Sequence, residues 1–197
     1  AQGIDDMMTK TVGPATQMAA DAVEWRMDRY WTALQEAAAS EIFQNAGPTD
    51  PELIPVRDDI AGRNGFLYIG KMDVDGYSST GYSYADEDYF QQCKATMKPY
   101  ISDIMSDGEQ MIFLLEVPIV IDGQFEGVVY GGISADFLSA IVVNLAVGND
   151  GVAYVLDKRG NVIGHREASV VEEGSNMIEA ARSDSGLADI AAVNQRM

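Results

Sequence analysis

Residues 110–134 have the sequence QMIFLLEVPIVIDGQFEGVVYGGIS. From Gln110 to Ile121, apolar side chains recur at every second position, which is the period of a strand, and they are Met111, Phe113, Leu115, Val117, Ile119 and Ile121. Asp122-Gly123 has the composition of a tight hairpin turn, and Phe125–Ser134 follows it as a second apolar run. The stretch predicts two long antiparallel strands joined at Asp122-Gly123, with the apolar side chains of the first on one face.

The residues that precede this hairpin predict further strands and short helices. Thr49-Asp50-Pro51-Glu52 combines a capping residue with a proline at the first helical position, so we expect a short helix that ends near Gly62. The next predicted elements are strands Phe66–Asp73 and Tyr77–Gly81 around a turn at Asp75-Gly76, a helix over Asp86–Thr96 and a strand over Tyr100–Ile104.

A second unit is predicted to begin after the hairpin and a helix that Ser134 or Asp136 caps. Gly148-Asn149-Asp150-Gly151 is typical of a joint between units. The elements predicted beyond it are strands Val152–Leu156 and Val162–His165 and a helix that Ser175 caps and that runs towards Met197. A two-stranded sheet is marginal alone, so we expect the second unit to be incomplete in this sequence.

Residues 4–46 predict a long helix, because apolar residues recur at steps of three and four. About 40 helical residues extend for about 60 Å, which is more than the core of a compact domain needs. Asn45-Ala46-Gly47-Pro48 contains the glycine and proline that end helices. We therefore expect a spine in which residues 15–44 form one helix packed along both units.

Composition excludes several classes of function. The chain has 197 residues and a formal net charge of −18, which disfavours nucleic acid polymers and anionic membrane surfaces, because both require clustered Lys and Arg. Cys93 and His165 are the single cysteine and the single histidine, so a Cys/His zinc site is excluded. No nucleophile–base motif is present. We predict no enzyme activity, no metal and no cofactor.

Several segments occur in an order that resembles a known family. They are Asp86–Phe90, Tyr100–Asp103, Val117–Ile119 with Gly127–Val129, Ile133–Leu138 and Gly160–His165. Together with the long helix they resemble the double-Cache (dCache) extracellular sensor domains of bacterial transmembrane receptors, most of all those of methyl-accepting chemotaxis proteins.

The resemblance implies an α/β (α+β) fold in which a long N-terminal helix carries two PAS-like modules, each with a central antiparallel sheet. It implies a spine helix over residues 1–47, a membrane-distal ligand-binding module over 48–147 and the start of a membrane-proximal module over 148–197. It also implies an extracellular or periplasmic sensor, anchored in the cell membrane as a homodimer of the full receptor, that takes part in chemotaxis or other signal transduction.

Amino-acid-binding members of the family carry a Tyr, an Arg five residues later, then an aromatic pair, and an Asp on the last long strand. In this chain those positions hold Tyr82, Glu87, Tyr89 with Phe90, and Gly132. Without the Arg and the Asp, the charges that hold a zwitterion are lost, so we expect L-amino acids to bind no better than at millimolar concentration. We also expect Gly132 to leave room for a flat ring.

The ligand site predicted from these residues is rich in tyrosine. Its members are Tyr68, Lys71, Tyr82, Tyr84, Glu87, Tyr89, Phe90, Asp103, Tyr130 and Gly132. Tyrosines offer flat apolar area and a hydroxyl, which suits a small planar heterocycle such as a nucleobase, with Glu87 or Asp103 accepting from ring N–H groups.

Two alternatives to a nucleobase sensor remain open from the sequence. The first is an amine or short-carboxylate sensor of a sensor kinase or cyclase, in which Lys71 is the cation for a carboxylate. The second is a non-signalling adhesion or binding module that recognises another protein through its acidic surface.

Overall fold

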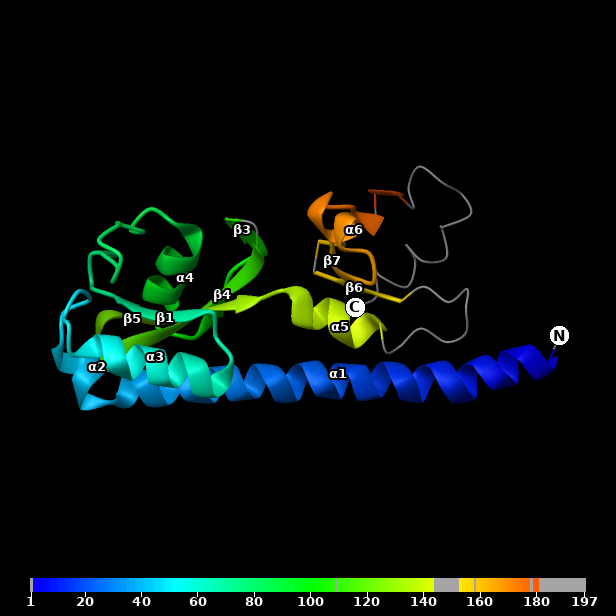
Figure 1. Cartoon of the computed structure of the whole chain (residues 1–197), viewed down its shortest axis with the longest axis horizontal. Coiled ribbons are helices and arrows are strands. Elements are labelled where there is room, and N and C mark those ends of the chain that lie inside the picture. Colours follow the sequence, from blue (N-terminus) through cyan, green and yellow to red (C-terminus); the bar gives the residue numbers. More distant parts are fainter. Residues whose placement is uncertain (1, 109, 144–152, 158, 178, 181–197) are drawn as a thin grey trace. The chain divides into compact units, whose positions relative to one another are not determined.

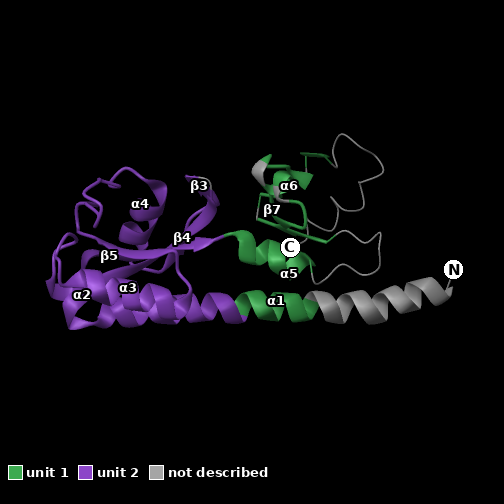
Figure 2. Ribbon diagram, in the orientation of Figure 1, with its two compact units in different colours: residues 1–24, 135–197 green, residues 25–134 purple. Residues whose placement is uncertain are grey.

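The computed structural model describes residues 2–108, 110–143, 153–157, 159–177 and 179–180. The chain divides into two units, residues 25–134 and residues 1–24 with 135–197 (Figure 2). In chain order the elements are α1 (Gln2–Ala39), α2 (Glu41–Asn45), α3 (Leu53–Asn64), β1 (Tyr68–Met72), α4 (Asp88–Thr96), β2 (Tyr100–Ile101), β3 (Met105–Asp107), β4 (Gln110–Ile121), β5 (Gln124–Ser134), α5 (Asp136–Val143), β6 (Tyr154–Leu156), β7 (Val162–His165) and α6 (Ala168–Glu172) (Figure 1). The predicted fold class, helices with antiparallel sheets after a long N-terminal helix, is confirmed.

Unit 25–134 is built on an antiparallel sheet with the strand order β1-β5-β4-β2, and β3 also pairs with β4. The predicted hairpin is confirmed, because β4 pairs antiparallel with β5 along both strands, with a bulge between Ile119 and Val120. Asp122 and Gly123 have φ values of 52° and 78°. Two successive positive φ values are what the tightest hairpin turns require, which explains the Asp-Gly pair.

Side chains cover both faces of this sheet. A Cβ atom on Gly131 would lie 3.3 Å from Leu34, so this face of β5 packs against α1. The opposite face packs under α4 through a buried cluster, which consists of Met72, Phe90, Cys93, Leu114, Val128 and Tyr130. Because both faces are covered, Ile112–Val117 are all buried. The prediction of a single apolar face on β4 is therefore wrong at the middle of the strand.

The predicted long helix is interrupted near its C-terminal end. α1 ends at Ala39, Ser40 has an extended backbone with φ −77° and ψ 143°, and α2 begins at Glu41. Ser40 Oγ donates to the Ala37 carbonyl oxygen at 2.7 Å, a local bond that competes with helical hydrogen bonding. One uninterrupted helix over 15–44 is thus wrong at Ser40, and packing of the helix along both units stays a prediction.

The strand predicted over Tyr77–Gly81 does not form as a strand. This segment contributes only isolated bridges, for example between Met72 and Ser78. Ser79 Oγ accepts a hydrogen bond from the Lys71 backbone N–H at 2.8 Å. The serine side chain thus takes the place of the backbone carbonyl that a paired strand would supply.

The strand predicted over Tyr100–Ile104 is shorter than expected, because β2 ends at Ile101. At Ser102 the side-chain hydroxyl accepts a hydrogen bond from the Leu114 N–H at 2.9 Å, in place of the backbone carbonyl oxygen that a continuing strand would offer. The chain then pairs with β4 again as β3, which was not predicted.

In the other unit, β6 and β7 form the predicted antiparallel hairpin. Asp157 organises its turn, since Oδ1 accepts from the Arg159 and Asn161 N–H groups. α6 was not predicted. The helix expected from Ser175 is capped one residue later, by Asn176 Oδ1, which accepts from the Glu179 N–H at 2.9 Å. The joint at 148–151, Val152 and residues 181–197 lie outside the described residues.

Candidate functional site

A cavity of about 760 Å³ lies in unit 25–134, against the face of the sheet that α4 covers. This volume falls within the range of about 300–1,000 Å³ that is usual for small-molecule sites. Its tyrosines are Tyr68, Tyr84, Tyr89 and Tyr130, and its polar and charged lining residues are Arg57, Asp58, Ser79, Thr80, Ser106 and Asp107. They come from α3, β1, the loop after β1, α4, β3 and β5.

Two tyrosine–glycine pairs form the inner wall of the cavity. Tyr68 on β1 is the cross-strand partner of Gly132 on β5, and Tyr130 on β5 is the partner of Gly70 on β1. Each ring lies over the opposite glycine, because a Cβ atom would be 2.5 Å from the Tyr68 ring at Gly132 and 2.2 Å from the Tyr130 ring at Gly70. The two rings meet edge to face at 6.4 Å between centroids. The prediction that Gly132 leaves room for a flat ligand ring is therefore wrong, because the Tyr68 ring fills that space.

Three tyrosines of the cavity, Tyr68, Tyr89 and Tyr130, stay protonated at ordinary pH because their pKa values are raised. Burial raises the pKa of Tyr68, and the neighbouring Asp107 carboxylate, which accepts its hydroxyl hydrogen bond, raises it further. Burial also raises the pKa values of Tyr89 and Tyr130. At Tyr130, hydrogen bonds from serine side chains and the charge of Arg57 act in the opposite direction. Each hydroxyl is thus a neutral group that can donate a hydrogen bond.

Arg57 on α3 brings a positive charge to the cavity. Its side chain is half-buried, and its Nε is fully buried with no hydrogen-bond partner among the described residues. A buried N–H donor without a partner is costly, because its hydration is lost and not replaced. A guanidinium in this state is well suited to a carboxylate, which can accept two parallel hydrogen bonds from it.

Four of the predicted site residues line the cavity, namely Tyr68, Tyr84, Tyr89 and Tyr130. Phe90 is 1% exposed and belongs to the core cluster beneath α4. That the four tyrosines contact a ligand stays a prediction.

The remaining predicted residues are not among those that line the cavity. Tyr82 is 70% exposed, and Glu87 and Asp103 are exposed as well. Lys71 is buried, but its Nζ donates to the Ala46 carbonyl oxygen at 2.6 Å, and burial lowers its pKa. Lys71 therefore secures the segment after α2 rather than presenting its charge to the cavity.

None of the six polar and charged lining residues was predicted from the sequence, and neither was Glu116 beside the cavity. Arg57 and Asp107 carry no local signal, because only the packing of α3 and β3 brings them to the cavity. Glu116 had a signal: it is the one charged residue among the apolar residues from Met111 to Ile121, where both strand faces are apolar. A strand with two apolar faces is buried on both, so its glutamate is buried too.

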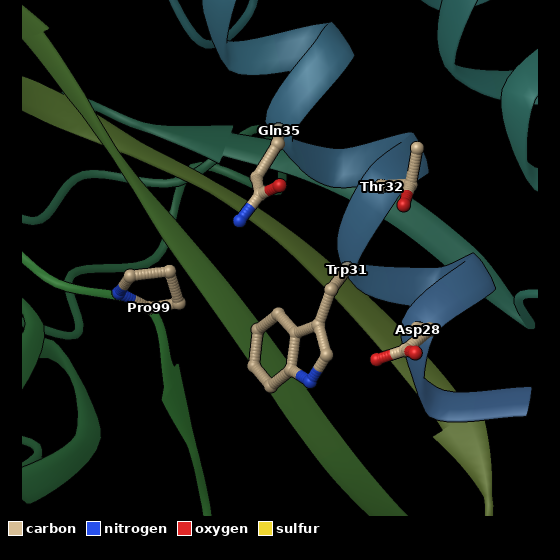
Figure 3. A pocket seen from close by; sticks show the side chains of 5 residues that line it. All are labelled: Asp28, Trp31, Thr32, Gln35 and Pro99. Carbon is tan, nitrogen blue, oxygen red and sulfur yellow. The ribbon is translucent and has the colours of Figure 1, made fainter. Parts of the chain in front are cut away.

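A second hollow, of about 550 Å³, lies outside this cavity. Figure 3 shows the Asp28, Trp31, Thr32 and Gln35 side chains, which project from α1, with Pro99 on the opposite side. Its five lining residues include one carboxylate and no cation, and none belongs to the predicted site.

Neither a membrane span nor a metal site is found in the part of the chain that the structure describes. No helix there combines the length and hydropathy that a bilayer requires. The same residues contain no group of three or more His, Cys, Asp or Glu side chains placed to hold a metal ion.

The chain belongs to the Cache domain family, whose double-Cache pattern matches residues 4–194. Cache domains are ligand-binding sensor modules of membrane receptors, which agrees with a tyrosine-lined cavity in unit 25–134. A comparison with curated protein sequences found no match.

Solved structures with this fold include sensor domains of chemoreceptors and of histidine kinases. The ligand-binding domain of the Pseudomonas aeruginosa PAO1 amino acid chemoreceptor PctC, in complex with GABA, has a TM-score of 0.74 at 15% identity, with 90% of this chain and 83% of that chain covered. The ligand-binding domain of the Pseudomonas fluorescens chemoreceptor CtaA, in complex with L-isoleucine, has a TM-score of 0.67 at 16% identity, covering 93% and 76%. The extracellular domain of the histidine kinase mmHK1S-Z3 has a TM-score of 0.68 at 14% identity, covering 96% and 79%. At these identities the likeness establishes the fold alone.

Proposed function

We propose that this chain is the outward-facing sensor of a membrane-anchored, homodimeric signalling receptor, and that its ligand is a small carboxylate bound by Arg57. The observation that carries the ligand class is the buried, unpartnered Arg57 Nε in a cavity with tyrosine walls. The division into a spine over 1–47, a ligand-binding module over 48–147 and a second module over 148–197 is part of the proposal.

A nucleobase has less support than a carboxylate. That hypothesis required Glu87 or Asp103 to accept from ring N–H groups, and it required open space at Gly132. Glu87 and Asp103 are exposed and not among the lining residues, and the Tyr68 ring occupies the space at Gly132.

Amino acids are not excluded by the absence of an arginine at Glu87 and of an aspartate at Gly132. The cavity has instead a cation on α3, Arg57, and a carboxylate on β3, Asp107. Two of the structural neighbours are complexes with GABA and with L-isoleucine, molecules that each carry one carboxylate. A carboxylate ligand that also bears an ammonium group is therefore compatible with the site.

The test is titration calorimetry with a panel of short carboxylates, amino acids including GABA, amines and nucleobases. We expect the tightest ligand to carry a carboxylate. Arg57→Gln should then weaken its binding by about 10- to 150-fold, which corresponds to the roughly 1.5–3 kcal/mol of a charge-assisted hydrogen bond.

Arg63→Gln is the matched control, because Arg63 lies on the same helix, is exposed and pairs with Asp59. Its affinity should equal that of the wild type. A carboxylate that binds Arg57→Gln as tightly as the wild type, or a panel in which only amines or nucleobases bind, would contradict the proposed ligand class.

A further inference from the structure

Glu116 occupies the middle of the sheet, on the face that α4 covers. It is the cross-strand partner of Tyr100 on β2 and of Tyr130 on β5. Its exposed fraction is 0%, and neither carboxyl oxygen has a hydrogen-bond partner among the described residues. A charged carboxylate in such a place has lost its hydration without compensation.

Among the described residues, no cation contributes to the pKa shift of Glu116, and Lys94 on α4 lies over the Phe90 and Phe125 rings. α4 presents Tyr89 and Cys93, whose pKa values are both affected by the Glu116 charge, and the neighbouring strands present Tyr100 and Tyr130. Tyr89, Cys93 and Tyr130, whose pKa values burial raises, are neutral near pH 7. Burial alone raises the pKa of Glu116 from 4.5 to about 8. The closed state, in which α4 rests on the sheet, therefore holds a proton on this side chain at neutral pH.

The position of Glu116 connects this proton to the ligand cavity. Tyr89 and Tyr130, which flank Glu116, both line the cavity. α4 lies over β4 and β5 (Figure 1), so Tyr89 keeps its place only while α4 rests on the sheet. An ionised Glu116 beneath α4 opposes that arrangement, because the charge reaches water only when the helix moves away.

We propose that Glu116 is a proton-binding site that makes closure of α4 over the sheet, and with it the shape of the ligand cavity, depend on the pH outside the cell. The proton would be a second ligand of the sensor, separate from the molecule in the cavity. This inference does not depend on which molecule binds there.

Proton linkage gives the direction in which pH changes the opening of α4. In the closed state Glu116 keeps its proton up to about pH 8, whereas in an opened state its pKa returns to 4.5. The stabilisation of the closed state is complete below pH 4.5, falls between these two values and is lost as the pH passes 8. Opening should become easier by about tenfold per pH unit inside this window, which is the linkage of one proton.

Cys93 offers a direct measure of this opening. It is the single cysteine of the sequence, is 0% exposed on α4, and burial with the nearby Glu116 charge raises its pKa to about 12. It therefore reacts only when α4 opens. The experiment is to follow reaction of the whole chain with 4,4′-dithiodipyridine between pH 5.5 and 8.5. Each rate is divided by that of the urea-unfolded chain at the same pH, which removes the ionisation of the thiol itself.

We expect the wild-type ratio to rise by about tenfold per pH unit up to about pH 7.5 and then to level off. Glu116→Gln, which resembles the protonated acid in shape, should give a flat ratio, and Glu116→Leu should also be flat because it carries no charge. A wild-type ratio that is flat, or a thiol that does not react at any pH, overturns the inference. So does an equal slope in the wild type and in either variant. Failure of the carboxylate screen would leave this result unaffected.

Discussion

At the residue scale, the cavity wall depends on the pairing of large tyrosine rings on one strand with glycines on the neighbouring strand. Tyr68 and Tyr130 each lie across a glycine of the neighbouring strand, so the sheet contributes two large rings where it has two positions without side chains. Such aromatic–glycine pairs bury the glycine backbone and fix the tilt of the ring. The same pairing explains how a cavity with a tyrosine wall can exist on a sheet that is buried on both faces.

Gly132→Ala should disturb this wall. The new Cβ would lie 2.5 Å from the Tyr68 ring, so the ring must move, and we expect a loss of about 1–3 kcal/mol in the free energy of unfolding. Urea denaturation followed by circular dichroism measures it. Gly47→Ala is the control, since a Cβ there has nothing within 4 Å. An equal loss in the free energy of unfolding for the two substitutions would mean that Tyr68 is not tightly packed on Gly132.

At the element scale, serine side chains determine where several elements stop. Ser40 separates α1 from α2, and Ser102 separates β2 from β3. In both cases a hydroxyl takes part in a hydrogen bond that the regular element would otherwise supply from its backbone. The break at Ser102 allows β3 to turn along β4, which is how Asp107 reaches the cavity.

Ser102→Ala should therefore destabilise the sheet. The Leu114 N–H, which donates to Ser102 Oγ in a buried setting, would lose its partner, at an expected cost of about 1–3 kcal/mol. Ser106→Ala, at an exposed position with a bond to the Gly108 carbonyl, should cost less than about 0.5 kcal/mol. Chemical denaturation measures the free energy of unfolding of both variants. Similar losses in the two would show that the hydrogen bond to Ser102 does not stabilise the sheet.

At the scale of the whole molecule, the sheet, its two covering layers and the cavity belong to one unit. Residues 25–134 contain β1 to β5, α3 beside β1, the part of α1 that covers one face of the sheet, and α4 on the other face. Arg57, Glu116 and the cavity tyrosines all fall inside these limits.

A chain restricted to residues 25–134 should fold by itself, because the buried cluster between α4 and the sheet consists of residues of this unit. We expect a cooperative urea transition and the same carboxylate affinity as in the longer chain. Circular dichroism and calorimetry test these two properties. A broad, non-cooperative transition would show that the unit requires the rest of the chain for its stability.

Local sequence was sufficient for the elements whose signals lie within a few residues. The Asp122-Gly123 turn requires two positive φ values that few other pairs adopt, and this turn fixes the register of the two long apolar strands that it joins. The family that the chain resembles is confirmed by the double-Cache match over residues 4–194, and the predicted long hairpin by the pairing of β4 with β5.

The site was determined by tertiary structure, because charge and space at a cavity depend on which elements meet there. Arg57 is an ordinary helix residue in the sequence, and only the packing of α3 beside β1 brings it to the cavity. Glu87 and Asp103 remain at the surface, although their sequence neighbours resemble site residues. Gly132 signals open space in the sequence, yet the ring of Tyr68, which is 64 residues away in the chain and paired with it in the sheet, occupies that space.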